Sequence, residues 1–290
     1  MPEPKLSLIT INSGRDAHLD NLLRGLARGE ELPAETIVVT PQGERAPAAP
    51  AGLRVRHLTL PPATDGRGFR VGVARNHGAE RARGELLVFL DVDCVPGPTY
   101  VRDLRRCLRS AGGLVMATPH YLDRPLPPDW TFAVLAHRSR PHPHRPAPRP
   151  GLTPQPDYAL FWSLCFGMRR ADWDRLGGFD GAYYGYGAED TDLGFRARTV
   201  GLPFSLTDSP VFHQQHPVHR PPLHQFASIV DNCRHFYGKW GVWPMGNWLA
   251  AFRKLGLVEW AGPQGPCLRV IAPPPPELVA DSRVADAAWA

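Results

Sequence analysis

The sequence predicts an α/β fold with a mostly parallel central sheet flanked by helices on both faces. Short apolar segments suited to buried strands alternate with helical patterns along the first half of the chain. Directly after the first apolar segment, leucines recur at the i, i+3, i+4 and i+7 spacing of one helix face. Such alternation is typical of sheets whose strands are joined by crossover helices.

The expected elements follow one another closely in this half. Strands are expected at 6–11, 36–40, 53–60, 86–90 and 114–118, and helices around 19–26, over 70–83 and from Pro98 onward. Residues 141–156 are rich in Pro, His and Arg and are expected to form a mobile loop. Beyond them, a strand is expected at 158–168, and helices over 171–176, 190–200 and 223–237.

We therefore expect a single domain over residues 1–260. It would consist of a donor-binding half (1–124), a mobile loop (125–156) and an acceptor and catalytic half (157–260). Residues 261–290, which include four consecutive prolines, are expected to be an irregular tail.

Composition limits the classes of partner. The 290 residues are 43% hydrophobic, which is enough for a sizeable core. A net charge of +5 without a basic-aromatic stripe argues against nucleic acid, and suits an anionic small molecule or a peripheral membrane contact. Five cysteines form no CxxC pair, and no apolar segment approaches the ~20 residues that cross a bilayer, so a cytoplasmic protein is expected.

Two carboxylates follow the strand expected at 86–90. Asp91 and Asp93 flank Val92 where that strand gives way to a loop, and ligands of α/β sheets bind at this edge. Both carboxylates can turn toward a divalent cation such as Mn²⁺ or Mg²⁺, which would bridge the diphosphate of a nucleotide. The alternative is an Asp-rich turn without a ligand.

The surrounding segment, FRVGVARNHGAERARGELLVFLDVDCVPGP (69–98), resembles family 2 glycosyltransferases of the GT-A (Rossmann-like) fold. In that family an Ala-Arg-Asn-x-Gly helix leads to a strand ending in an Asp-x-Asp (DXD) motif. The resemblance implies donor-binding roles here, with turn chemistry as the alternative for Thr10, Asn12 and Asp65. The donor-binding residues so implied are Thr10, Asn12, Asp65, Arg75, Asn76, Asp91, Val92 and Asp93.

A second segment, GGFDGAYYGYGAEDTDLGFRAR (177–198), resembles the C-terminal region of galactosyltransferase-like enzymes. The resemblance assigns the catalytic base to Asp190 and orientation of the acceptor to Glu189. The alternative is that Asp190 only caps a helix, while Asp192 pairs with Arg196. The acceptor-binding residues expected are Trp162, Tyr186, Gly187 and Glu189.

Histidines follow further along the chain. The resemblance assigns the role of metal ligand to His213, together with Asp93 and Asp91. His216 and His219 are expected to be ordinary loop residues, because Pro217 prevents a helix that would align them. Three tryptophans near Pro244 are expected to be in a core rather than in an acceptor or membrane-facing patch: Trp240, Trp243 and Trp248.

These features together predict a metal-dependent, inverting glycosyltransferase. It would move a sugar from a nucleoside diphosphate donor, expected to be a UDP-sugar, to a hydroxyl of a glycan, lipid-linked, peptide or small-molecule acceptor. A nucleotidyltransferase is one alternative, although the loop after the first strand (11–15) has little of the Gly-rich basic character it needs. The other is a non-catalytic sugar-nucleotide or glycan-binding protein on the same fold.

Overall fold

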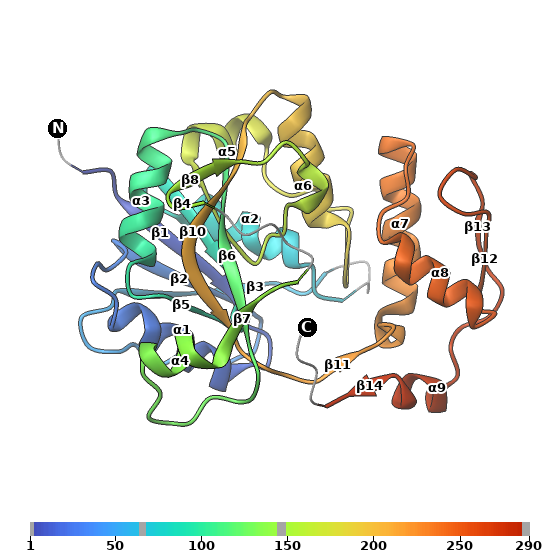
Figure 1. Ribbon diagram of the computed structural model, residues 1–290, viewed down its shortest axis with the longest axis horizontal. Coiled ribbons are helices and arrows are strands. Elements are labelled where there is room, and N and C mark those ends of the chain that lie inside the picture. Colours follow the sequence, from blue (N-terminus) through green and yellow to red (C-terminus); the bar gives the residue numbers. More distant parts are fainter. Residues whose placement is uncertain (1–2, 64–67, 144–148, 286–290) are drawn as a thin grey trace.

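A computed structural model describes residues 3–63, 68–143 and 149–285. Its centre is a ten-stranded sheet with the strand order β3-β2-β1-β4-β9-β6-β10-β5, while β7 pairs with β6 and β8 with β10 (Figure 1). The strands of this sheet are β1 (Leu6–Ile11), β2 (Glu35–Pro41), β3 (Val55–Leu60), β4 (Leu86–Leu90), β5 (Cys94–Pro96), β6 (Leu114–Leu122), β7 (Ser139–Pro141), β8 (Leu152–Pro154), β9 (Cys165–Arg169) and β10 (Phe204–His213).

Helices cover this sheet and bury its apolar side chains. Leucines at one face of α1, for example, are almost fully buried, as their helical spacing predicts. The helices of this part are α1 (Asp16–Ala27), α2 (Val71–Arg81), α3 (Tyr100–Ser110), α4 (Phe132–Arg138), α5 (Arg170–Leu176) and α6 (Glu189–Thr199). The α/β fold with a large sheet flanked by helices is thus confirmed.

The sheet is mixed, whereas the sequence predicted a mostly parallel one. Strands β3, β2, β1 and β4 run parallel, because each is followed by a crossover before the next. Strand β9 instead lies antiparallel between β4 and β6, and β5 pairs antiparallel with β10. Strand direction depends on the route of the preceding connection, which apolar patterning does not encode.

The segment at 125–156, expected as a loop, contains regular elements where it is described. Helix α4 buries Leu135 in a small cluster with Trp130, and β7 and β8 extend the main sheet. These elements are only three to seven residues long, so they carry too little periodicity to be recognised from the sequence.

The C-terminal residues form a helical unit with a hydrophobic cluster of its own, shown in orange and red to one side of the sheet in Figure 1. The cluster includes Phe226, Ile229, Leu249 and Phe252. The elements of this part are β11 (Val218–His219), α7 (Phe226–Trp240), α8 (Gly246–Lys254), β12 (Val258–Trp260), β13 (Leu268–Val270), α9 (Pro276–Asp281) and β14 (Arg283–Val284). The region expected as an irregular tail therefore contributes β13, α9 and β14.

Every helix in the described part of the chain is too short or too polar to span a membrane.

Candidate active site

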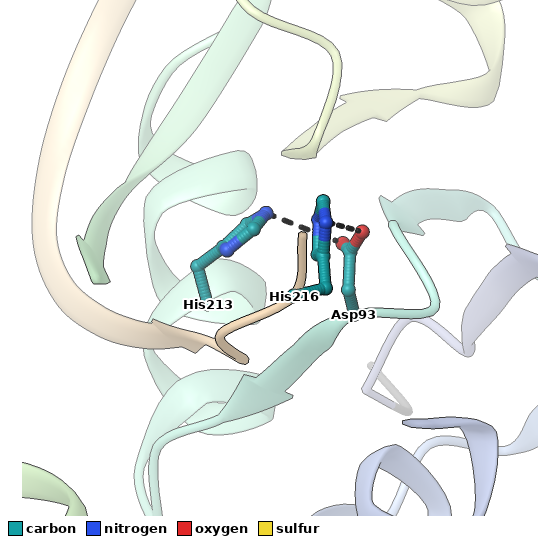
Figure 2. A group of neighbouring side chains, drawn as sticks. All are labelled: Asp93, His213 and His216. Carbon is teal, nitrogen blue, oxygen red and sulfur yellow. Dashed lines mark ion pairs between the residues drawn. The ribbon is translucent and has the colours of Figure 1, made fainter. Parts of the chain in front are cut away.

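Asp93, His213 and His216 converge at the end of the central strands (Figure 2). Asp93 directly precedes β5, and the antiparallel register of β5 with β10 places Cys94 opposite His213. The amide of Gln214 donates to the carbonyl of Asp93 (2.7 Å), which fixes the chain just before His216. Potential ligand atoms of the three residues lie within 4.8 Å of one another.

Each imidazole faces a different oxygen of the Asp93 carboxylate. His213 Nε2 lies 3.6 Å from Oδ1, and His216 Nε2 lies 3.4 Å from Oδ2. In the tautomer that donates from Nδ1 to the Pro217 carbonyl (3.0 Å), His216 keeps a lone pair on Nε2. The ring of His213 stacks on Tyr121, with centroids 4.7 Å apart, so its orientation is fixed by packing.

The electrostatics of this group suit cation binding. Burial opposes ionisation of Asp93, but His213, His216 and Arg15 outweigh it and hold the pKa of Asp93 below its usual range. Burial lowers the pKa of His213 to about 4 despite the attraction of Asp93, so the imidazole is neutral at pH 7. One carboxylate and two imidazoles are a donor set that fits a divalent first-row metal.

The structure groups the potential metal ligands differently from the sequence in two respects. His216, expected as an ordinary loop residue, belongs to the group, because a turn can bring i and i+3 residues together without a helix. Asp91 is not part of this group, because its carboxylate forms an ion pair with Arg75 instead. His219, also expected as an ordinary loop residue, lies in β11, and its Nδ1 is 2.8 Å from Ser282 Oγ.

Arg15 is a site residue that sequence reasoning missed. It lies just before α1, and its guanidinium bonds Oδ2 of Asp93, the oxygen that also faces His216. A basic residue in the loop after the first strand was the available signal, but its contact with a residue 78 positions away needed the fold.

Asp91 and Arg75 form a second charged contact at the end of β4. Arg75 Nη2 donates to Asp91 Oδ1 (2.6 Å), and the guanidinium lies 5.2 Å from the ring centre of Phe179. The Arg75 side chain is only 5% exposed, and its Nη1 is buried without a hydrogen-bond partner. A buried guanidinium nitrogen lacking an acceptor is well suited to an anionic ligand oxygen, which agrees with the expected donor role.

Glu189 and Asp190 are the first residues of α6. Burial, then the charge of Asp190, raise the pKa of Glu189 to about 7, while Arg75 acts in the opposite direction and Asp91 adds to the increase. The acidic pair and the Arg75–Asp91 contact are therefore within electrostatic reach of one another. Asp190 Oδ1 also accepts from the amide of Thr191 (2.7 Å), so a contact at the helix start is present as well.

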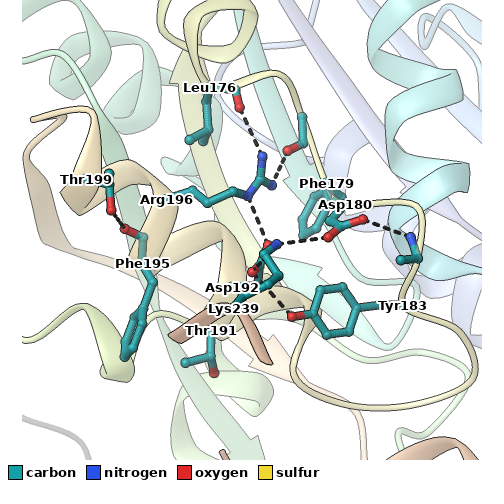
Figure 3. Close-up of polar contacts among 12 residues, drawn as sticks. Leu176, Phe179, Asp180, Tyr183, Thr191, Asp192, Phe195, Arg196, Thr199 and Lys239 are labelled. Carbon is teal, nitrogen blue, oxygen red and sulfur yellow. Dashed lines mark hydrogen bonds and ion pairs between the residues drawn. The ribbon is translucent and has the colours of Figure 1, made fainter. Parts of the chain in front are cut away.

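The ion pair given in the alternative, between Asp192 and Arg196, is present, with Arg196 Nε 2.9 Å from the Asp192 carboxylate. The Tyr183 hydroxyl and the Lys239 ammonium contact the other oxygen of this buried carboxylate (Figure 3). Lys239 belongs to α7, so the network joins the acidic helix to the C-terminal unit.

The loop at 177–188 is held by side chains on both sides. Asn76 accepts from the amide of Phe179 and donates to its carbonyl, each at 2.8 Å, so it positions the loop rather than facing an open site. From α7, Asn232 donates to the carbonyls of Tyr184 (2.8 Å) and Gly187 (2.9 Å).

Gly187 and Tyr186 both lie against the C-terminal unit. Gly187 has a φ of +96°, and a Cβ there would lie 2.5 Å from Met245 Sδ, so a glycine is needed. Tyr186 is 49% exposed, and its ring stacks on Trp248.

The remaining expected residues make other contacts or lie outside the described residues. Thr10 is buried in β1, and Asn12 bonds Asp16 (2.7 Å) and the Arg15 amide, the turn chemistry given as the alternative. Val92 is buried in the turn, and Trp162 lies edge-on to His142 at 5.1 Å. Asp65 lies outside the described residues.

Comparisons with known proteins agree with this geometry. Residues 63–176 match glycosyl transferase family 2, and residues 147–220 match the family described as the N-terminal domain of galactosyltransferase. The chain is related to the glycosyltransferases. It is 28% identical over 262 residues to validoxylamine A glucosyltransferase of Streptomyces hygroscopicus subsp. limoneus, and 27% identical to that of S. hygroscopicus subsp. jinggangensis (strain 5008). These alignments cover 81% of this chain but only 57% and 61% of the two relatives.

Solved structures show the same fold. GalNAc-T7, solved with UDP, GalNAc and Mn²⁺, superposes with a TM-score of 0.54 at 13% identity, over 81% of this chain and 50% of that one. S. aureus TarS (residues 1–349) gives 0.52 at 14% identity, over 80% and 64%. The predicted GT-A fold and the predicted resemblance are thereby confirmed.

Proposed function

We propose that the protein is an inverting glycosyltransferase that moves a sugar from a UDP-sugar to an acceptor hydroxyl. The observation that carries the proposal is the buried Arg75 guanidinium, which donates to Asp91 at the end of β4 and leaves Nη1 without a partner, beside the group of Asp93, His213 and His216. A buried cation and a potential metal site at this edge suit a diphosphate, and the acidic start of α6 suits an acceptor. The relatives named for glucosyl transfer to validoxylamine A support a glucosyl donor, and the neighbour solved with UDP supports the nucleotide.

The residues divide the chemistry as follows. Asp190 takes the proton of the acceptor hydroxyl while that oxygen attacks the anomeric carbon from the side opposite the diphosphate. The new C–O bond forms as the bond to the phosphate oxygen breaks, which inverts the anomeric centre. Glu189 orients the acceptor, and Arg75 Nη1 neutralises charge on the departing nucleoside diphosphate.

Asp93, His213 and His216 would hold a divalent cation, which supplies further charge neutralisation at the diphosphate when bound. Two imidazole donors favour a transition ion such as Mn²⁺ over Mg²⁺, which prefers oxygen ligands and water. Arg15 already balances the charge of Asp93.

The test is the substitution Asp190→Asn, which keeps the shape of the side chain but removes the base. Transfer should fall on the order of 10³-fold, within the range for loss of a general base. The thermal stabilisation given by UDP with Mn²⁺ should persist, because no donor contact is lost. Asp208→Asn, at an exposed carboxylate that bonds the Gly151 amide, is the matched control. Normal turnover of the Asp190 variant would refute the assignment of the base, and a wild type that no nucleoside diphosphate stabilises would refute the donor.

A further inference from the structure

Gln214 lies in the turn between the two histidines of the proposed metal group. It is only 4% exposed, although its side chain carries both a donor and an acceptor. Its backbone amide already bonds the carbonyl of Asp93, as described above. A buried side-chain amide needs a partner at each end, so the partners of Gln214 show what holds this turn in place.

A chain of hydrogen bonds connects the Gln214 side chain to the indole of Trp130. Trp130 Nε1 donates to Asn21 Oδ1 (2.8 Å), and Asn21 Nδ2 donates to Gln214 Oε1 (2.8 Å). At the other end of the amide, Gln214 Nε2 donates to the carbonyl of His18 (3.1 Å). The chain thus joins the segment before α4, helix α1 and the turn after β10, across 109 and 193 positions of the sequence.

The two ends of this chain determine its direction. An indole N–H can only donate, and a backbone carbonyl can only accept. Asn21 must therefore turn Oδ1 toward Trp130 and Nδ2 toward Gln214. Gln214 must in turn present Oε1 to Asn21 and Nε2 to the carbonyl of His18. Every bond is satisfied in one orientation only, so neither amide can flip without losing its partners.

Trp130 is itself held firmly. It is 1% exposed and packs in a cluster with Val95 and Phe212, which are paired in β5 and β10 next to His213. Arg28 Nη1 donates to the Trp130 carbonyl (2.8 Å), and its guanidinium lies 4.8 Å from the centre of the indole ring. Helices α1 and α4 consequently lie side by side (Figure 1).

We propose that Gln214 is a positioning residue for the metal group and that Trp130, acting through Asn21, fixes its amide. This inference rests on the proposed function, because it concerns the divalent cation of the same site. Gln214 holds the backbone between the two imidazoles, so both face the Asp93 carboxylate before the ion arrives. Ligands that are already oriented lose less freedom on binding, which raises the affinity for the ion.

The segment that carries Trp130 therefore has a function at the donor edge. It falls within residues 125–156, which the sequence predicted to be a mobile loop. The hydrogen-bond chain gives one end of that segment a structural link to the turn that carries His213 and His216.

The experiment compares Gln214→Met with Gln215→Met in the full chain. Methionine is flexible and close to glutamine in length, but it lacks the amide donor and acceptor. Gln215 is the matched control, because it lies in the same turn while its Nε2 donates to the carbonyl of Ala285 (2.7 Å). Calorimetry measures Mn²⁺ affinity, the visible absorption of the Co²⁺ form reports the coordination geometry, and the melting temperature is measured without metal.

Gln214→Met should lower Mn²⁺ affinity about 10-fold, the scale of losses when a residue behind a metal ligand is removed. The Co²⁺ absorption should change in intensity, because the imidazoles are no longer held at the same angles. Gln215→Met should alter neither quantity.

Trp130→Phe keeps a ring in the cluster and removes only the N–H donor. Mn²⁺ affinity should fall about 3-fold, the scale of one hydrogen bond. The loss is small because Arg24 Nη1 lies 3.5 Å from Asn21 Oδ1 and remains as a donor. This variant also tests the proposal if Gln214→Met does not fold.

A lower melting temperature with unchanged Mn²⁺ affinity and Co²⁺ absorption in both variants would overturn the positioning role. The chain of hydrogen bonds would then stabilise only the fold, and the proposed function would remain intact. An equal loss of affinity in Gln215→Met would overturn it as well. A wild type that binds neither Mn²⁺ nor Co²⁺ would instead refute the metal group of the proposed function, and the positioning role with it.

Discussion

The proposed donor edge, which is formed by Asp93, His213 and His216, and the proposed acceptor loop, residues 177–188, are held in place by different interactions. At the donor edge, backbone pairing of β5 with β10 brings Asp93 beside His213. The loop at 177–188 has no strand partner. Side chains from α2, α6 and α7 bond its backbone instead: Asn76, Arg196 and Asn232.

This difference predicts how each part responds to substitution. Removing one side chain at the donor edge should delete a chemical group while leaving its neighbours in position. Removing one of the side chains that hold the loop should displace several groups together, including Tyr186 and the acidic pair at the start of α6. Substitutions at the donor edge should therefore weaken metal binding, whereas substitutions at the side chains that hold the loop should reduce sugar transfer.

The largest effect is expected for His216→Ala at the donor edge. The variant removes one of three potential ligands, so Mn²⁺ affinity measured by calorimetry should fall about 100-fold, equivalent to roughly 2.7 kcal/mol. The melting temperature without metal should stay close to that of the wild type, because the strand register does not depend on this imidazole. Metal-dependent stabilisation by UDP should weaken in parallel.

His219→Ala is the matched control, since this imidazole bonds Ser282 and lies outside the group. It should leave Mn²⁺ affinity unchanged. Equal affinities in the His216 variant and the wild type would show that the structure groups the wrong histidine.

Much of the donor edge could be predicted from sequence. The five apolar residues directly before Asp91 indicate a buried strand. The position of Asp91 and Asp93 after the end of that strand indicates a ligand-binding site at this edge of the sheet. The ligand set itself could not be completed. Asp91 and Asp93 are equivalent in the pattern, and only the fold shows that Arg75 binds one while two histidines face the other.

A smaller, more selective effect is expected for Asn232→Ala in α7. The substitution removes the donors to the carbonyls of Tyr184 and Gly187 and leaves those buried groups unsatisfied. The free energy of unfolding should fall by about 2 kcal/mol. Transfer to an acceptor should fall at least ~10-fold, since reacting groups need close positioning. Mn²⁺ affinity should not change, in contrast to the histidine variant.

Asn247→Ala, at an exposed position of α8, is the control for substitution within the same unit. Asn232→Asp should behave like the alanine variant, because a carboxylate cannot donate to the loop carbonyls. If the alanine variant transfers sugar at the normal rate, α7 does not position the loop.

The acceptor side was accessible to sequence reasoning only in part. The Gly/Tyr composition of the loop and the acidic pair after it were visible, and so was the helix at 223–237. The sequence pattern did not link the loop to that helix, because Asn232 donates a hydrogen bond to a carbonyl 45 positions earlier in the chain. Trp248 was expected in a core, and it packs against the hydrophobic cluster of the C-terminal unit while its ring also stacks on Tyr186.

The smallest effect on transfer is expected for Glu189→Gln, and its effect on stability should have the opposite sign. With its pKa raised from 4.5 to about 7, Glu189 keeps its proton in the folded state between these values, whereas the unfolded chain has already lost it. Stability should therefore decrease as pH rises through this window and level off above it. The glutamine variant does not titrate, so it should be more stable than the wild type at pH 8, by roughly 1–3 kcal/mol, and nearly equal to it near pH 4.5.

Urea unfolding at the two pH values measures this difference, with Glu259→Gln, at an exposed glutamate paired to Arg269, as the control. Transfer by the Glu189 variant should fall even where the fold is more stable, because the acceptor loses a carboxylate that orients it. A stability difference that is the same at both pH values would mean that Glu189 is not held away from water beside Asp190. The acceptor side would then lack the buried carboxyl that distinguishes it from the donor edge, where Arg15 neutralises the charge of Asp93.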